Sequence, residues 1–399
     1  MMAEWKTIKV GDIGQIITGK TPKTSNSSYY GGIIPFLTPS DDMSVKYVRE
    51  TKKSITEDGR LSVKNATLPA NAVCVSCIGS DLGKVVITTE RTVTNQQINS
   101  IVINEDNYDI DYIYYAMVEL GKILNFHSKT STAVPIVNKS SFSQYELKCP
   151  PLEIQKKIGK LLSSIDSKIE ENERINNNLE QQIEAILLSF IENTNSNNVK
   201  LGDYLYIKGR IGWKGLKKDE YLEHSDFRII NGESLTKAGI DWLKAGYISQ
   251  SRYDESPEIM LKKGDILLSK DGTIGKIGYI DSLSAPTTVA SGIFVIRNIQ
   301  PEIISTTFIY FLLKSRLFTD FITARTEGSV IPHLYQKDFM QFEFPLPSKD
   351  KMASFEKLTA PMFSLIVSNL NENERLTRLR DSLLPRLMSG ELDVSDIDL

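Results

Sequence analysis

The chain has 399 residues, of which 41% are apolar and 24% charged, so it is long enough for two or three domains of ordinary globular composition. It contains no run of about 18 apolar residues and no apolar segment near its N-terminus, so we expect neither a membrane span nor a secretory signal. The three cysteines form no disulfide framework, which predicts a cytoplasmic protein in a reducing environment.

The net charge of −3 is distributed unevenly. Residues 1–150 hold 16 basic and 15 acidic side chains and residues 199–347 hold 19 and 18, a net charge of +1 in each segment. Residues 151–198 hold 5 basic and 8 acidic side chains, and residues 348–399 hold 7 basic and 9 acidic ones. These two segments therefore carry the net negative charge of the chain. The near-neutral segments remain compatible with a local basic face. We predict these four segments as the domains: two globular modules, each followed by a helix.

The first globular segment, residues 1–150, alternates short apolar runs with turn residues, which is typical of mixed α and β structure. Residues 73–76 and 84–87 predict the two strands of a hairpin, with a loop at residues 79–81 between them. Residues 111–117 predict a helix. We therefore expect an α+β module built on a mostly irregular sheet.

The first helical segment follows Pro150 and Pro151, and residues 152–193 contain no proline. Apolar residues recur there at alternating spacings of four and three, which indicates a coiled-coil seam rather than the broader stripe of an ordinary amphipathic helix. Asn172 and Asn176 interrupt this seam, and polar seam residues fix register and partner at a cost in stability. The alternative is an ordinary core helix of one domain, but the strict seam continues for four heptads.

The second globular segment repeats this pattern. Residues 263–280 predict a hairpin with its turn near Asp271 and Gly272, and residues 307–314 predict a helix. The last segment repeats the long helix, because adding 197 to each seam position of the first helix gives a second seam. Its polar interruptions are Asn369 and Asn373, which match Asn172 and Asn176.

The match between the two halves is an internal duplication, which has to be recognised before a fold is assigned. The offset is 191 at Gly11 and Gly202, 193 at Ser76 and Ser269, and a constant 197 from Pro135 onward. An offset that changes in loops and is constant along helices is expected of a duplicated fold.

The duplication also predicts how the helices pack. A helix of about 40 residues is roughly 60 Å long. Because each module leads into its own helix, the two helices pack most simply antiparallel, with Asn172 near Asn373 and Asn176 near Asn369. The predicted fold is therefore α+β: two tandem mixed modules separated by a long antiparallel two-helix coiled coil, in pseudo-twofold relation.

Polar and basic loops recur at matching positions of both modules. Lysine and arginine contact phosphates, and asparagine, glutamine and arginine can make bidentate contacts to bases. The alternative is that these are ordinary solvated loops, which are polar by default. The residues that we select as candidates for backbone or base contact are Lys20, Lys23, Tyr30, Lys84, Gln96, Lys129, Arg210, Lys214, Lys270, Lys276, Arg325 and His333.

The sequence contains no catalytic or metal-binding pattern that we can identify. Cys74 and Cys77 form a single CxxC in a strand-like run without a second pair, so we expect them in a packed core rather than at zinc. The three histidines, His127, His224 and His333, have neither triad-like nor metal-like spacing. No Walker-type phosphate loop occurs. We therefore expect no catalytic residue, no metal and no bound cofactor.

The duplicated module-plus-helix layout resembles the specificity subunits of type I restriction–modification systems. The resemblance covers essentially the whole chain. It also rests on Gly83-Lys84 and Gly275-Lys276 after the matching strands, on the junction at residues 150–155, and on the helix-end run at residues 383–390. The junction at residues 345–350 departs from the Pro-Pro-x-x-x-Gln form that is commoner in that family.

The resemblance implies that each module is a target-recognition domain for one half of a split double-stranded DNA site. The helices are then expected to set the unread spacer and to dock two methyltransferase subunits, which bind S-adenosylmethionine and flip out adenine. A motor-nuclease restriction subunit completes such a complex. The chain itself would be a non-catalytic subunit in DNA modification and restriction.

Two other functions stay open from the sequence. One is a coiled-coil protein-interaction adaptor without DNA recognition, whose modules bind proteins or peptides. The other is a self-contained nuclease or methyltransferase, which the absent catalytic and cofactor motifs disfavour. The DNA-specificity subunit accounts for the most features of the chain.

Overall fold

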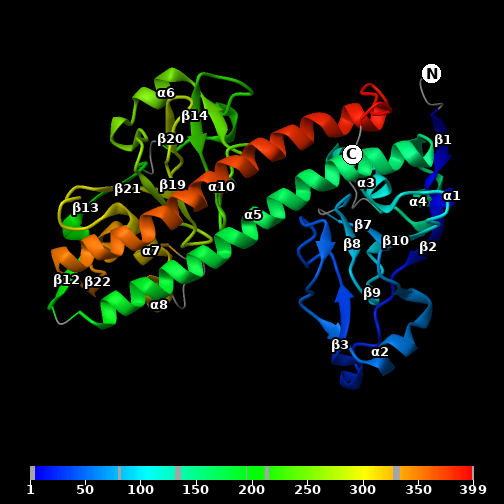
Figure 1. Ribbon diagram of the computed structural model, residues 1–399, viewed down its shortest axis with the longest axis horizontal. Helices are drawn as coiled ribbons and strands as arrows, with labels where there is room; N and C mark the ends of the chain where they lie inside the picture. Colours follow the sequence, from blue (N-terminus) through cyan, green and yellow to red (C-terminus); the bar gives the residue numbers. More distant parts are fainter. Residues whose placement is uncertain are drawn as a thin grey trace. The chain divides into compact units, whose positions relative to one another are not determined.

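A computed structural model describes residues 5–79, 82–130, 136–194, 196–211, 215–326 and 333–397, with the side chains of residues 127–130 and 326 left out (Figure 1). The chain forms two compact units. Unit 1 comprises Met1–Ile169 together with Leu376–Leu399, and unit 2 comprises Glu170–Arg375. None of the helices in these ranges is long and apolar enough to cross a lipid bilayer.

Unit 1 is built on a five-stranded sheet with the order β2-β10-β7-β8-β4. Its strands are β2 (Gly14–Thr18), β10 (Ile98–Ile103), β7 (Val73–Ser76), β8 (Val85–Thr88) and β4 (Tyr47–Val48). A four-stranded sheet has the order β5-β3-β9-β6, with β5 (Ser54–Ile55), β3 (Tyr30–Leu37), β9 (Thr92–Thr94) and β6 (Thr67–Leu68). The pair β1 (Lys6–Lys9) and β11 (Glu146–Cys149) is separate. The helices are α1 (Val10–Ile13), α2 (Glu57–Ser62), α3 (Ile110–Thr130) and α4 (Lys139–Gln144).

The strands β7 and β8 are apolar on both faces because both faces are covered. Val75 and Ile87 belong to a core that includes Tyr112 of α3, whereas Cys74 and Val86 pack on the other side with Leu37. Burial raises the pKa of the Cys74 thiol to about 12. Cys77 is likewise buried, and burial raises its pKa to about 11. The expected packed-core position of the two cysteines is confirmed.

Unit 2 contains a four-stranded sheet with the order β13-β21-β18-β19. Its strands are β13 (Leu205–Gly209), β21 (Ile293–Asn298), β18 (Ile266–Ser269) and β19 (Ile277–Tyr279). The three-stranded sheet is β17 (Gly246–Ile248), β14 (Phe227–Ile230) and β20 (Thr287–Val289), and the pairs are β12 (Asn198–Lys200) with β22 (Glu343–Pro345) and β15 (Leu235–Thr236) with β16 (Gly239–Ile240). The shorter helices are α6 (Gln250–Asp254), α7 (Thr306–Lys314), α8 (Arg316–Thr326) and α9 (Gln336–Phe339).

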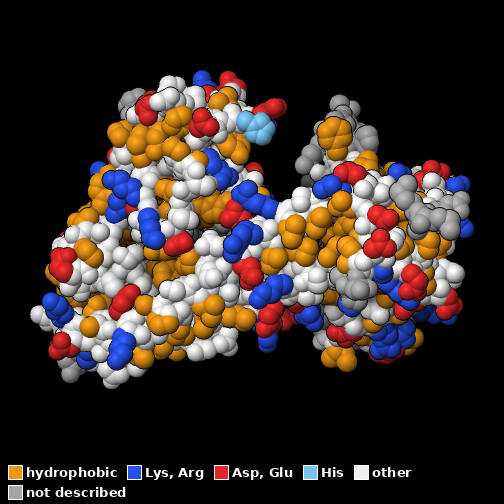
Figure 2. Space-filling view, turned by 45° about the horizontal axis from the view of Figure 1, so that its top comes forward, with side chains coloured by type: hydrophobic (Ala, Val, Ile, Leu, Met, Phe, Trp, Pro, Cys, Tyr) orange, Lys and Arg blue, Asp and Glu red, His pale blue; other side chains and the backbone are white. Residues whose placement is uncertain are grey.

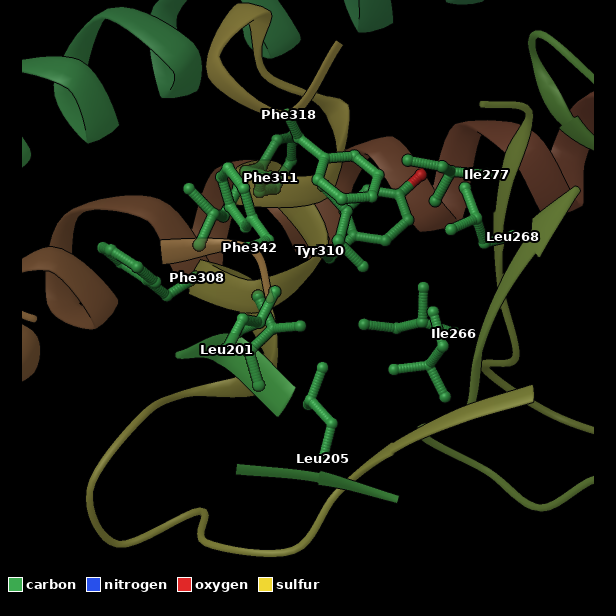
Figure 3. Packing of buried hydrophobic residues seen from close by; sticks show 14 of the residues in the cluster. Leu201, Leu205, Ile266, Leu268, Ile277, Phe308, Tyr310, Phe311, Phe318 and Phe342 are labelled. Atoms are coloured by element: carbon green, nitrogen blue, oxygen red, sulfur yellow. The ribbon is translucent and has the colours of Figure 1, made fainter. Parts of the chain in front are cut away.

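The core of unit 2 combines aliphatic side chains with a group of aromatic ones. Figure 3 shows side chains of α7 and α8, among them Phe311 and Phe318, gathered near the apolar side chains of the sheet, such as Ile266 and Leu268. Every residue of α7 from Thr307 to Leu313 is buried, which is expected of a helix that is apolar all round.

The two units repeat one pairing scheme, as the duplication predicts. The order β2-β10-β7-β8 in unit 1 matches β13-β21-β18-β19 in unit 2, and β1-β11 matches β12-β22. Both predicted hairpins are confirmed, because β7 pairs antiparallel with β8, and β18 with β19. The predicted helices at residues 111–117 and 307–314 are confirmed within α3 and α7. The mixed α and β character of both modules is therefore as expected.

The two long helices are α5 (Leu152–Glu192) and α10 (Lys349–Ser389), each of 41 residues. In unit 2 they run antiparallel, since Phe190 packs on Phe355 while Asn172 contacts Asn373. The Asn172 amide donates to Asn373 Oδ1 at 2.8 Å and the Asn369 amide donates to Asn176 Oδ1 at 2.8 Å. These are the pairs expected from the repeated seam.

Replacing Asn369 by leucine will lower the free energy of unfolding by about 1–3 kcal/mol, because Asn176 Oδ1 then stays buried without its donor. Replacing Asn176 as well will recover most of that loss, since two apolar groups leave no unpaired polar atom between them. Urea unfolding of the full chain measures both variants. A double variant no more stable than Asn369→Leu would contradict this account of the pair.

Candidate nucleic-acid interface

A serine, a glycine and a lysine close the hairpin of unit 1. The backbone N–H of Ser76 donates to the Lys84 carbonyl at 2.9 Å, and the Lys84 N–H donates to the Ser76 hydroxyl oxygen at 2.9 Å. Gly83 adopts φ +91°, a conformation that favours glycine, and its N–H donates to the Ser76 carbonyl at 2.8 Å. The turn leaves the side chain of Lys84 exposed.

The hairpin of unit 2 is closed in the same way. The backbone N–H of Ser269 donates to the Lys276 carbonyl at 2.9 Å, and the Lys276 N–H donates to the Ser269 hydroxyl oxygen at 2.8 Å. Gly275 also adopts φ +91°. The Lys276 ammonium donates to the Gly232 carbonyl at 2.9 Å and stays partly exposed. The fold therefore presents Lys84 and Lys276 from equivalent turns.

The turn of unit 1 is packed more closely than its counterpart. A Cβ on Gly83 would lie 2.1 Å from the carbonyl oxygen of Gly121 in α3, and a Cβ on Gly121 would lie 2.0 Å from that of Gly83. In unit 2 the nearest atom to a Cβ on Gly275 is Ile322 Cδ1 at 4.0 Å. The two glycines hold the Lys84 turn directly on α3.

Two of the candidate loops of unit 1 lie side by side. The Lys20 N–H donates to the Thr94 carbonyl at 2.8 Å, and the Thr21 hydroxyl donates to Gln96 Oε1 at 2.7 Å. A Cβ on Gly19 would lie 2.0 Å from the Asn95 carbonyl oxygen, so a glycine is needed for this close approach. Lys20 and Gln96 are exposed, and the structure brings them together.

The other candidates in this part of unit 1 have different surroundings. Lys23 is exposed, and its carbonyl accepts a backbone hydrogen bond from the Asn26 N–H at 3.1 Å. Tyr30 is half-buried, its hydroxyl donates to the Pro22 carbonyl at 2.7 Å, and its ring packs edge-on against Phe36. Burial raises the pKa of the Tyr30 hydroxyl. These contacts give Tyr30 a role in holding the loop.

In unit 2, Lys270 and His333 lie on adjacent segments. The Leu334 N–H donates to the Lys270 carbonyl at 2.9 Å, and the Lys270 ammonium lies 5.2 Å from the centre of the Phe294 ring. His333 Nδ1 contacts Asp271 Oδ1. Arg325 is exposed near the end of α8, and its guanidinium carbon lies 3.6 Å from the centre of the Phe321 ring.

Arg210 is a correction to the expected set. Its side chain is only 2% exposed, and its guanidinium donates to the Val289 carbonyl at 3.0 Å, with Thr288 and Ser256 as further partners. Burial lowers the pKa of this group. A guanidinium that is buried beside β20 cannot reach DNA, so the role of Arg210 is structural. Lys214 and the side chain of Lys129 lie outside the described residues.

A cleft of about 580 Å³ in unit 1 contains charged residues that the sequence analysis did not select. Lys84 lines it together with Lys122 of α3 and Asp166, Arg380 and Asp381 of the long helices. Arg380 Nη1 donates to Asp166 Oδ1 at 2.8 Å. Burial lowers the pKa of Arg380, but this hydrogen bond and the charges of Asp166 and Asp381 outweigh it and raise the pKa. The sequence contained one signal for Arg380. Adding 197 to Ile183, an apolar seam residue of the first helix, gives Arg380, so a charged residue occupies a seam position of the second helix.

The face drawn in Figure 2 carries charges of both signs. On the face drawn in Figure 2, lysine and arginine side chains alternate with aspartate and glutamate over the surface of each unit. This agrees with the near-neutral charge of each module. Among the residues that the structure describes, no group of three or more His, Cys, Asp or Glu side chains could hold a metal ion.

Comparison with known proteins places this geometry in a family. Residues 2–181 and residues 193–374 each match the Methylase_S family, described as the type I restriction modification DNA specificity domain. The specificity subunit of the type I restriction enzyme MjaIX from Methanocaldococcus jannaschii is 25% identical, over 99% of this chain and 95% of that protein. The HindI specificity subunit from Haemophilus influenzae is 33% identical over 43% of this chain and 38% of its own length.

A solved structure supports the fold. The crystal structure of the type I restriction–modification S subunit from M. genitalium superposes with a TM-score of 0.57 at 18% identity, over 97% of this chain and 96% of that one. The two family matches cover most of the chain and coincide with its two structural repeats. The chain therefore belongs to the family of type I restriction–modification DNA specificity subunits.

Proposed function

We propose that the chain selects a bipartite double-stranded DNA site, with one module recognising each half-site and the long helices setting the unread spacer between them. It performs no chemistry in this proposal. Two methyltransferase subunits dock on it and carry S-adenosylmethionine, and motor-nuclease restriction subunits join the complex. The chain supplies the sequence preference of that complex.

The duplicated Ser–Gly–Lys turn carries this proposal. Ser76 and Ser269 close equivalent hairpins and present Lys84 and Lys276 at matching places in two separate modules. A lysine in such a position contacts phosphate and sets the orientation of a module on the duplex, while neighbouring loops reach base edges. Two such modules in one chain are what a split site requires.

The long helices support the spacer role. α5 continues without a break over 41 residues, which corresponds to roughly 60 Å. Half-sites that are recognised from one face of B-DNA lie about 34–36 Å apart or at a multiple of that distance. The length of the helix is on the scale that a spacer between two such half-sites requires. The polar pairs inside the seam oppose slippage of one helix along the other.

Methylome sequencing of a host that carries the chain and its methyltransferase partners tests the proposal. We expect one methylated motif made of two short specified segments and an unspecified spacer of constant length, which disappears when the gene for this chain is deleted. A methylation pattern that is unchanged by the deletion would favour the adaptor function. As a companion test, the chain alone with DNA and S-adenosylmethionine should transfer no methyl group, and transfer would revive the self-contained methyltransferase.

A further inference from the structure

One bridged pair of residues occupies equivalent backbone positions in the two modules, but its side chains are apolar in one module and polar in the other. In unit 1, Ile78 forms an isolated antiparallel bridge with Ile136, just beyond the end of β7. In unit 2, Asp271 forms the same bridge with His333, just beyond the end of β18. The duplication offsets of 193 and 197 relate the members of the two pairs.

The hydrogen bonds around the two bridges agree in detail. In unit 1 the Val137 N–H donates to the Cys77 carbonyl at 2.9 Å, and in unit 2 the Leu334 N–H donates to the Lys270 carbonyl at 2.9 Å. The same two residues also donate through their own N–H groups. The Cys77 N–H donates to the Gln97 carbonyl at 2.7 Å, and the Lys270 N–H donates to the Gly292 carbonyl at 2.9 Å. The two backbones therefore share one hydrogen-bond pattern, and the difference lies in the side chains.

The side chains at both bridges reach solvent. Ile136 is 64% exposed, although burial of an isoleucine side chain is worth about 1.5–3 kcal/mol. The side chains of Asp271 and His333 are 41% and 33% exposed, and they contact each other through Asp271 Oδ1 and His333 Nδ1. Tyr335 is also exposed, with its ring centre 4.4 Å from that of His333. Unit 1 thus presents an apolar pair where unit 2 presents a hydrogen-bonding pair.

The chemistry of each pair selects a class of base. Thymine is distinguished in the major groove by its methyl group, which apolar side chains contact. His333 Nδ1 contacts Asp271 Oδ1, so the ring holds the carboxylate in place at the bridge. A carboxylate has two acceptor oxygens and no donor. It therefore favours the amino group that adenine or cytosine presents in the major groove, and disfavours the carbonyl oxygens of guanine and thymine.

We infer that these bridges are specificity-determining contacts: Ile78 and Ile136 select thymine in the half-site of module 1, and Asp271 and His333 select adenine or cytosine, by its major-groove amino group, in the half-site of module 2. The inference rests on the proposed function, because it assumes that each module recognises one half-site. The strongest base contacts, which are bidentate, discriminate roughly 5- to 150-fold against the wrong base, and this range is the upper bound for each bridge.

Exchanging the pairs between modules tests the assignment. One variant carries Asp271→Ile and His333→Ile, and the other carries Ile78→Asp and Ile136→His. Each is assembled with the methyltransferase subunits, and the methylated motif is sequenced from the host. We expect the first variant to change one position of the module 2 half-site from adenine or cytosine to thymine, with the other half-site unchanged. The second should make the reverse change in the module 1 half-site only.

Matched controls lie on the same modules. His224→Ile and Ile33→His replace exposed residues away from the bridges with the same chemistry, and they should leave the motif unchanged. The conservative variant His333→Gln, checked for an unaltered melting temperature, should weaken selection at the same single position. This variant keeps the test decisive if an exchanged pair fails to fold.

The outcomes separate the inference from the proposed function. A wild-type chain that gives no bipartite motif contradicts the proposed function itself. A bipartite wild-type motif that His333→Gln leaves unchanged, or that an exchanged and folded variant preserves, overturns the inference alone. It is also overturned if the exchange alters both half-sites, or if His224→Ile produces the same change as the bridge variants.

Discussion

Replacing Lys84 and Lys276 by alanine together will weaken DNA binding by the assembled complex by about 10- to 100-fold near 0.1 M salt. Each lysine that neutralises a phosphate releases counterions, so the double variant should also lower the slope of log affinity against log salt by about 1.8. Both lysines contribute to their turns through backbone groups, because each N–H donates to the hydroxyl oxygen of a serine. Alanine keeps those backbone bonds and removes the two charged side chains, together with the bond from the Lys276 ammonium to the Gly232 carbonyl.

The measurement is a titration of duplex DNA carrying the methylated motif at several salt concentrations between about 50 and 200 mM. The control variant replaces Lys156 and Lys357, two exposed lysines of the long helices, by alanine, which makes the same change in net charge. It should retain the wild-type slope. Equal losses in both double variants would indicate a general electrostatic effect and contradict the placement of Lys84 and Lys276 at the DNA.

Replacing Gly121 by alanine will destabilise the protein by about 1–3 kcal/mol, the usual range for overpacking. Helix propensity alone predicts the opposite sign, because alanine in a helix interior is favoured over glycine by about 0.5–1 kcal/mol. The added Cβ would lie 2.0 Å from the carbonyl oxygen of Gly83, and a backbone atom cannot rotate away as a side chain can. The turn that carries Lys84 must therefore move.

Urea unfolding compares this variant with Gly232→Ala. A Cβ at Gly232 meets no atom within 4 Å, so that substitution should be neutral or stabilising by up to about 1 kcal/mol. The Gly121→Ala variant is thus expected to be less stable than the Gly232→Ala variant. DNA binding gives a second measure, because displacement of the Gly83 turn should also reduce affinity. A stabilised Gly121→Ala protein with normal binding would show that the close approach is not needed.

The elements that the sequence predicted are those whose signals are local. Alternating spacings of four and three defined α5 and α10, and turn residues between apolar runs defined the two hairpins. Because the two halves repeat with a constant offset along the long helices, the seam of the first helix predicted the seam of the second. This was enough to match Asn172 and Asn176 with their partners on α10.

The features that sequence reasoning missed depend on contacts between distant residues. Arg210 was expected to contact DNA because it belongs to a polar, basic loop, but β20 and its neighbours supply carbonyl and hydroxyl groups that accept its hydrogen bonds inside the protein. The bond from Arg380 to Asp166 joins residues 214 positions apart, which no local pattern indicates. Ile136 did not stand out, because isoleucine is ordinarily buried and nothing in its neighbours marks it as exposed.

The division of the chain into units has a consequence for biosynthesis. Unit 2 is one continuous stretch, Glu170–Arg375, whereas unit 1 needs Leu376–Leu399 in addition to Met1–Ile169. Leu384, Leu387 and Val394 are buried in the core of unit 1, and Trp5 packs against Gly390. Domains generally fold as units while the ribosome delivers the chain from its N-terminus. The module that is synthesised first therefore cannot complete its core until the last helix of the chain has been made.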